Sequence, residues 1–201
     1  MTRVSPSGRV GDLVRRRTAP LNDLADHATD VARTCHAMAV RFHRGGKLVV
    51  FGNGGPSTDA QHVAVEFVHP VIVGKRALPA ISLTSDVATL TAVANRAGLS
   101  ETFAHQVRFL AEPTDIALGL SADGQCENVL RGLEAARDMG MLRVALVGGD
   151  GGQIAASKVA DHVLIAASTD PRVIKEVHVT MYHILWELVH VFFEQPGVLD
   201  V

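Results

Sequence analysis

Apolar positions follow two different rhythms along the chain. Five short runs are apolar almost throughout, which is typical of strands buried on both faces of a sheet. These runs span residues 47–51, 79–83, 116–120, 142–147 and 162–165. Between the runs, apolar residues recur three or four positions apart, which predicts helices. The helical segments span residues 57–68, 85–94, 103–110, 127–139 and 152–159.

This alternation predicts an α/β fold with three layers, because strands buried on both faces need helices above and below them. A further helix over residues 21–44 precedes the first strand and is expected to stop at Gly45-Gly46. A strongly apolar segment, residues 172–193, is longer than a crossover helix needs. An apolar terminal helix of this kind often forms an oligomer face. We therefore expect the N- and C-terminal helices to lie in an oligomer interface.

The first 19 residues show no apolar periodicity and combine Pro, Gly, Ser and Arg. They are expected to form a flexible arm (1–19) ahead of a single domain (20–201). Arg15, Arg16 and Arg17 make the only run of three consecutive basic residues. A run this short is more typical of a solvated segment than of a nucleic-acid contact.

The chain has 201 residues, 47% hydrophobic and 20% charged, which suits one globular domain with a full core. The formal net charge is −2, and no long basic stripe occurs, so a nucleic-acid partner is not expected. Cys35 and Cys126 provide neither a disulfide framework nor a CxxC metal pair. Without a signal core or a bilayer-spanning apolar run, the sequence predicts a cytoplasmic protein with no membrane partner.

Gly52, Asn53, Gly54 and Gly55 form a turn between the first strand and the helix that follows it. Glycine permits positive φ and close approach of the backbone to a ligand. The helix start offers unpaired N–H groups and a positive dipole end, which favour an anion. A plain tight turn would have the same sequence, so the turn alone leaves both interpretations open.

Two further groups of residues carry possible chemistry. His62 and Glu66 lie four residues apart on the following helix and share a face, where they could ligate a metal, exchange protons, or form an ordinary surface pair. After the third strand, Ser121 could bind an anion. Asp123 and Glu127 would oppose a phosphate there, and they favour the helix start by themselves.

On the terminal helix, Glu176 and His183 lie seven residues apart on roughly one face and could project toward a site. His178 and His190 are better explained as core or interface residues.

Taken together, residues 21–193 resemble the phosphoheptose isomerase branch of the sugar isomerase (SIS) family. The resemblance rests on the Gly-Asn-Gly-Gly turn, on Asp59-Ala60-Gln61-His62 with Glu66, on residues 90–95 and 150–153, and on Glu176, His178 and His183.

The resemblance implies a flavodoxin-like five-stranded parallel sheet and a homotetramer, a dimer being the alternative. It implies aldose–ketose isomerisation of sedoheptulose 7-phosphate, a sugar phosphate, through an enediol. Glu66 resembles the family's catalytic base and His183 its partner acid. His62, Glu66 and His183 match family zinc ligands, so zinc is the cofactor that the resemblance implies.

The chain also departs from the family pattern. Pro56 replaces a Ser, residues 121–126 replace a hydroxyl-rich phosphate loop, and Pro70 replaces an Arg. Arg96 replaces an Asp and Lys175 replaces a Gln zinc ligand. Arg96 or Lys175 could supply positive charge for a differently placed anion.

These departures leave an alternative function open: a non-catalytic SIS module that binds a sugar-phosphate-like ligand or a protein. A nucleotide-binding Rossmann domain is disfavoured, because the first turn lacks the GxGxxG spacing.

Overall fold

The computed structural model describes residues 6–195 and 197–199. At its centre lies a five-stranded parallel sheet with the strand order β2-β1-β3-β4-β5. The strands are β1 (Leu48–Gly52), β2 (Ala80–Ser82), β3 (Ile116–Ser121), β4 (Leu142–Gly148) and β5 (His162–Ala166). The predicted flavodoxin-like sheet is therefore confirmed, with the order that such doubly wound folds use.

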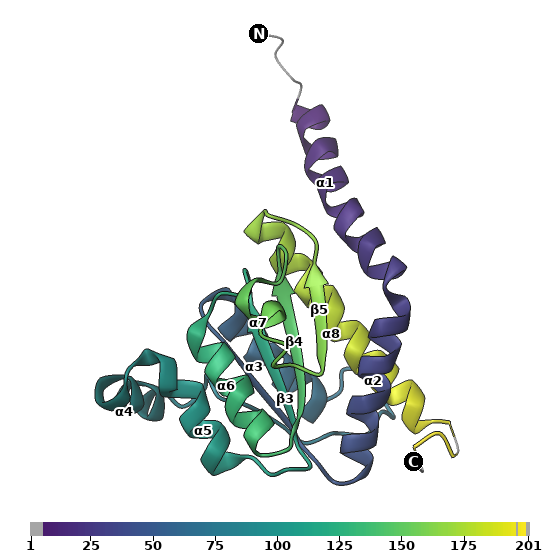
Figure 1. Cartoon of the computed structure of the whole chain (residues 1–201). Coiled ribbons are helices and arrows are strands. Elements are labelled where there is room, and N and C mark those ends of the chain that lie inside the picture. The colour runs from purple at the N-terminus through teal and green to yellow at the C-terminus, as the bar shows by residue number, and fades with distance from the viewer. Residues whose placement is uncertain (1–5, 196, 200–201) are drawn as a thin grey trace.

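Helices cover both faces of the sheet and complete three layers (Figure 1). The α-helices are α1 (Pro6–Asp26), α2 (Ala28–His43), α3 (Gly55–Val68), α4 (Val87–Ala97), α5 (Thr102–Leu110), α6 (Glu127–Asp138), α7 (Gly152–Ala156) and α8 (Pro171–Phe193), with a 3₁₀ turn at Leu99–Glu101. Helices α2, α3 and α8 share one hydrophobic core with the sheet, and α5, α6 and α7 share the other. The described helices include none long and apolar enough to cross a membrane.

The burial of each strand follows its place in the sheet. Every residue of β1 and β3 is buried, whereas the edge strands β2 and β5 are partly exposed. Central strands covered on both faces are apolar throughout, which is why the continuous apolar runs in the sequence located them correctly.

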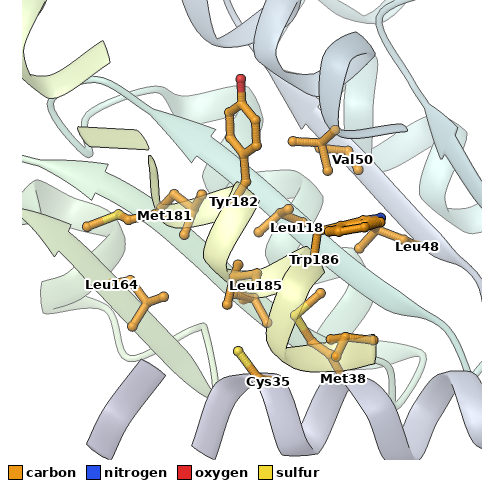
Figure 2. Packing of buried hydrophobic residues seen from close by; sticks show 14 of the residues in the cluster. Cys35, Met38, Leu48, Val50, Leu118, Leu164, Met181, Tyr182, Leu185 and Trp186 are labelled. Atoms are coloured by element: carbon orange, nitrogen blue, oxygen red, sulfur yellow. The ribbon is translucent and has the colours of Figure 1, made fainter. Parts of the chain in front are cut away.

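Helix α8 forms the largest part of one core. Its residues Met181, Leu185 and Trp186 pack against strand residues such as Leu118 and against Met38 of α2 (Figure 2). Tyr182 stands at the border of this core, and its hydroxyl points away from the apolar side chains labelled around it (Figure 2). The helix expected to face an oligomer partner therefore also buries much of its surface within the chain.

The expectation of a flexible arm over residues 1–19 is wrong for residues 6–19, which belong to α1. Residues 1–5 lie outside the described residues. Composition was misleading here, because Val10, Leu13 and Val14 do recur at helical spacing. Arg17 also forms an ion pair with Glu176 of α8, which ties α1 to the body of the domain. The helix predicted over residues 21–44 is in fact two helices that meet at His27.

Candidate functional site

The turn after β1 has the geometry that its glycines require. Gly54 has a φ of 63° and caps α3, and the Ser57 hydroxyl donates to the Gly54 carbonyl at 2.8 Å. A Cβ on Gly52 would lie 2.8 Å from the Leu120 carbonyl oxygen, so no larger side chain fits there without a shift. The turn therefore brings backbone N–H groups close to the carboxyl edge of the sheet.

Asn53 has its side chain committed to the fold. Its amide nitrogen donates to Asn128 Oδ1 at 2.6 Å, and the Asn128 amide donates back to Asn53 Oδ1 at 2.9 Å. Asn128 Nδ2 also lies 3.3 Å from the Thr102 hydroxyl. This reciprocal amide pair joins the first turn to α6 and holds it in place.

A pocket of about 250 Å³ opens beside the turn. It is lined by Gly52, Asn53, Gly54, Ser57, Thr84, Leu90, Thr91, Ala94, Leu99, Thr102, Phe103 and Asn128. Hydroxyl and amide groups together with the start of α3 make it suitable for a small polar or anionic ligand.

His62, Glu66 and His183 come together on the same side of the sheet, where α3 packs beside α8. One ligand atom from each residue lies within 4.8 Å of the others. His62 Nε2 is 3.1 Å from Glu66 Oε1, and the rings of His62 and His183 are perpendicular with centroids 5.3 Å apart. The structure thus brings together the three predicted metal-ligating residues from two separate helices.

Lys175 faces the first turn of α3 and lines a pocket of about 370 Å³ beside Gly55 and Pro56. Its ammonium nitrogen lies 2.5 Å from Asp59 Oδ1, 3.0 Å from the Gly55 carbonyl and 3.2 Å from the Thr58 hydroxyl. An ammonium has three protons, so these three acceptors can use all of them. Lys175 therefore fastens α8 to the first turn of α3.

In the second turn that was predicted to bind a ligand, residues 121–126, polar groups bond to one another. Ser121 is fully buried, and its hydroxyl lies 3.3 Å from Asp123 Oδ1, which also accepts from the Gln125 backbone N–H at 2.9 Å. Asp123 thus closes the turn ahead of α6, and Glu127 is the acidic residue in the first turn of that helix.

Arg96 lies on α4 and lines a different pocket, together with residues such as Thr89 and His105. The pocket beside the first turn does not include it among its lining residues.

His178 and His190 are buried on α8, in agreement with the interpretation as core residues. The two ring nitrogens of His190 lie 2.8 and 2.9 Å from the carbonyl oxygens of Trp186 and Arg76, and the protonated nitrogen donates to its carbonyl. Burial lowers the pKa of His178, and its Nε2 has no hydrogen-bond partner among the described residues.

Sequence reasoning missed several polar residues near these sites. Thr84 and Asn128 line the pocket beside the turn, and Tyr182 and Asp59 lie beside the His62 cluster. For Asn128 a signal exists, since it lies at the start of the helix after β3, at the same sheet edge as the first turn. For Tyr182 none exists, because its contact depends on how α8 crosses α3.

Comparison with known proteins agrees with this geometry. The sequence profile of the SIS domain family matches residues 15–148. The phosphoheptose isomerase of Solidesulfovibrio magneticus is 44% identical over 170 residues, covering 84% of this chain and 82% of the relative. That of Aquifex aeolicus is 39% identical over 163 residues, covering 81% and 84%.

Solved structures give the same result. A phosphoheptose isomerase from Francisella tularensis superposes with a TM-score of 0.86 at 31% identity, covering 94% of this chain and all of that one. One from Neisseria gonorrhoeae superposes with a TM-score of 0.83 at 28% identity, covering 92% and 98%. The chain belongs to the SIS domain family, and within it to the phosphoheptose isomerase branch.

Proposed function

We propose that this chain is a sugar-phosphate isomerase that interconverts sedoheptulose 7-phosphate and the corresponding aldose. The observation that carries the proposal is the cluster of His62, Glu66 and His183, formed by the helix that follows the glycine turn and by α8, within the fold shared with the phosphoheptose isomerases. An aldose–ketose isomerase needs one group that moves a proton between adjacent carbons and another that serves the oxygens.

Glu66 and His183 suit these two roles. A carboxylate can remove a proton from one carbon and return it to the neighbouring carbon, which passes the sugar through an enediol. An imidazole can donate a proton to the carbonyl oxygen and accept one from the hydroxyl. The Glu66 side chain is only 12% exposed, so bulk water competes little for its charge.

Zinc fits the same three residues by the chemistry of their donor atoms. Two imidazole nitrogens and one carboxylate oxygen are ligands that zinc prefers, and catalytic zinc sites keep three protein ligands and an open position. His62, Glu66 and His183 would hold the ion, and Glu66 has a second oxygen free to accept a proton. When bound, zinc polarises a carbonyl and stabilises negative charge on its oxygen. Lys175 is turned toward Asp59, so its positive charge is partly balanced there.

The phosphate group is proposed to bind at the start of α3. Backbone N–H groups around Gly54 and Gly55 favour an anion there. Asp123 makes the second turn less suitable than a hydroxyl-rich loop. Of the two cations considered from the sequence, Lys175 lies beside Gly55 at this end of α3, whereas Arg96 lines a different pocket.

The proposal is tested with purified protein and a panel of sugar phosphates that includes sedoheptulose 7-phosphate. We expect conversion of the heptose phosphate, loss of most activity after chelation, and recovery when zinc is restored. Absence of turnover on every sugar phosphate, with thermal stabilisation by one of them, would instead favour a non-catalytic ligand-binding module. The carboxylate Asp123 in the second turn is the observation that favours that alternative.

We also propose that the chain forms a homotetramer, as the family resemblance implies, and that it lies in the cytoplasm. Val10 and Val14 of α1 are 61% and 60% exposed, and a second copy would cover them. Sedimentation equilibrium distinguishes a tetramer from a dimer.

A further inference from the structure

The hydroxyl of Tyr182 contacts Nδ1 of the His62 ring. The Tyr182 hydroxyl lies 2.8 Å from His62 Nδ1, while His62 Nε2 faces Glu66 at 3.1 Å. The two ring nitrogens therefore have different partners, with Nε2 directed into the His62, Glu66 and His183 cluster. Whatever occupies Nδ1 decides which nitrogen carries the proton of the neutral ring.

A hydroxyl is suited to this position because it can both donate and accept. With the cluster metal-free, Nε2–H donates to Glu66 and the Tyr182 hydroxyl donates to Nδ1. A metal at Nε2 needs the lone pair of that nitrogen, so the proton must reside on Nδ1 and Tyr182 must accept it. The Tyr182 hydroxyl proton then needs an acceptor of its own.

Asp59 is the group that can accept it. One carboxylate oxygen, Oδ1, is held by Lys175 at 2.5 Å, but the buried Oδ2 has no hydrogen-bond partner among the described residues. A buried carboxylate oxygen without a partner is unusual and calls for a donor. The side chain of Asp59 lies within reach of the Tyr182 phenol.

We infer that Tyr182 is a positioning residue for His62, which presents the Nε2 lone pair to a metal through the chain His62 Nδ1–H, Tyr182 O–H and Asp59 Oδ2. Lys175 anchors the far end of this chain by holding Asp59 in place. The inference rests on the zinc site of the proposed function and deepens it. Tyr182 itself touches neither sugar nor metal in this arrangement.

The test is the zinc affinity of the Tyr182→Phe variant, measured by competition with a chromogenic chelator. Phenylalanine keeps the buried ring and removes only the hydroxyl. We expect zinc affinity to fall about 10- to 100-fold, as when other outer partners of metal-bound histidines are removed. Thr180→Val is the matched control, because it removes a hydroxyl of α8 that bonds to the Glu176 carbonyl instead. Its zinc affinity should equal that of the wild type.

Asp59→Asn tests the far contact separately. With its oxygen toward Lys175, the asparagine amide would donate to the Tyr182 oxygen, and Tyr182 would then donate to Nδ1 and leave the proton on Nε2. Zinc affinity should fall here too, while thermal unfolding of the metal-free protein reports whether either variant is merely destabilised.

Unchanged zinc affinity in a folded Tyr182→Phe protein would overturn this inference and leave the proposed function standing. Unchanged affinity in Asp59→Asn would remove Asp59 from the chain. A wild-type protein that binds zinc no better than its Glu66→Gln variant would overturn the zinc site of the proposed function, and this inference with it.

Discussion

At the scale of single residues, the burial of His178 makes the stability of the fold depend on pH. Burial lowers its pKa from the ordinary 6.5, and the Val147 backbone and Asp59 only partly offset this effect. The unfolded chain therefore binds a proton near pH 6.5 that the folded chain does not bind. Stability is fully present above that pH and falls as the pH drops through it toward the lower folded pKa.

The His178→Gln variant should lose part of this dependence. Between pH 7 and pH 5 we expect its free energy of unfolding to change less than that of the wild type. The difference grows by up to about 1.4 kcal/mol for each pH unit over which only the unfolded state is protonated. Urea unfolding at a series of pH values measures it, and identical pH dependence in the two proteins would contradict this account of His178.

Some residues of the candidate site could be predicted from their spacing along one helix, whereas others depend on contacts between distant segments. His62 and Glu66 could be predicted because four-residue spacing on one helix fixes a shared face. His183 was predicted through its helix and the family resemblance. Tyr182 and Asp59 could not be singled out, because their roles arise only where α8 crosses α3. Lys175 was predicted as an anion ligand, and the three acceptors around it come from that same crossing.

At the scale of elements, the β1–α3 turn depends on one glycine more than on its neighbours. In Gly52→Ala the new Cβ would meet the Leu120 carbonyl oxygen and Pro56 Cβ, each at 2.8 Å. We expect a loss of about 1–3 kcal/mol in the free energy of unfolding, because backbone must move to make room.

Gly55→Ala is the matched control for this prediction. The nearest atom to its Cβ would be Lys175 Cδ at 4.0 Å, which is ordinary contact. Its effect should stay within about 0.5 kcal/mol. Urea unfolding of both variants compares them, and equal stability would show that the close approach at Gly52 is not what constrains the turn.

The elements of the sheet could be predicted well because central parallel strands are apolar on both faces. Each of the five predicted runs overlaps a strand, and the helices between them were found as well. Helix α1 was missed because Pro, Gly and Arg dominate its composition, while its contacts to α8 are long-range. Pro20 lies inside α1, and a proline within a helix is a strong local signal against it.

At the scale of the whole molecule, the doubly wound sheet places the site. Turns at the carboxyl ends of parallel strands meet at one edge, which is where the Gly52–Gly55 turn and the second turn at Ser121–Cys126 lie. The three-layer order then brings α3 beside α8 on one face, so that residues 120 positions apart, such as His62 and Tyr182, come into contact.

In the proposed isomerisation, Glu66 moves the proton between two carbons of a sugar phosphate. The most direct measurement is the rate of aldose formation from sedoheptulose 7-phosphate by wild type and by Glu66→Gln. Glu134→Gln, which changes a partly buried carboxylate on α6 at the opposite layer, is the control. We expect Glu66→Gln to lose at least about 100-fold in rate and Glu134→Gln to keep the wild-type rate. Equal rates in wild type and Glu66→Gln, or no aldose from the wild type, would contradict this proposal.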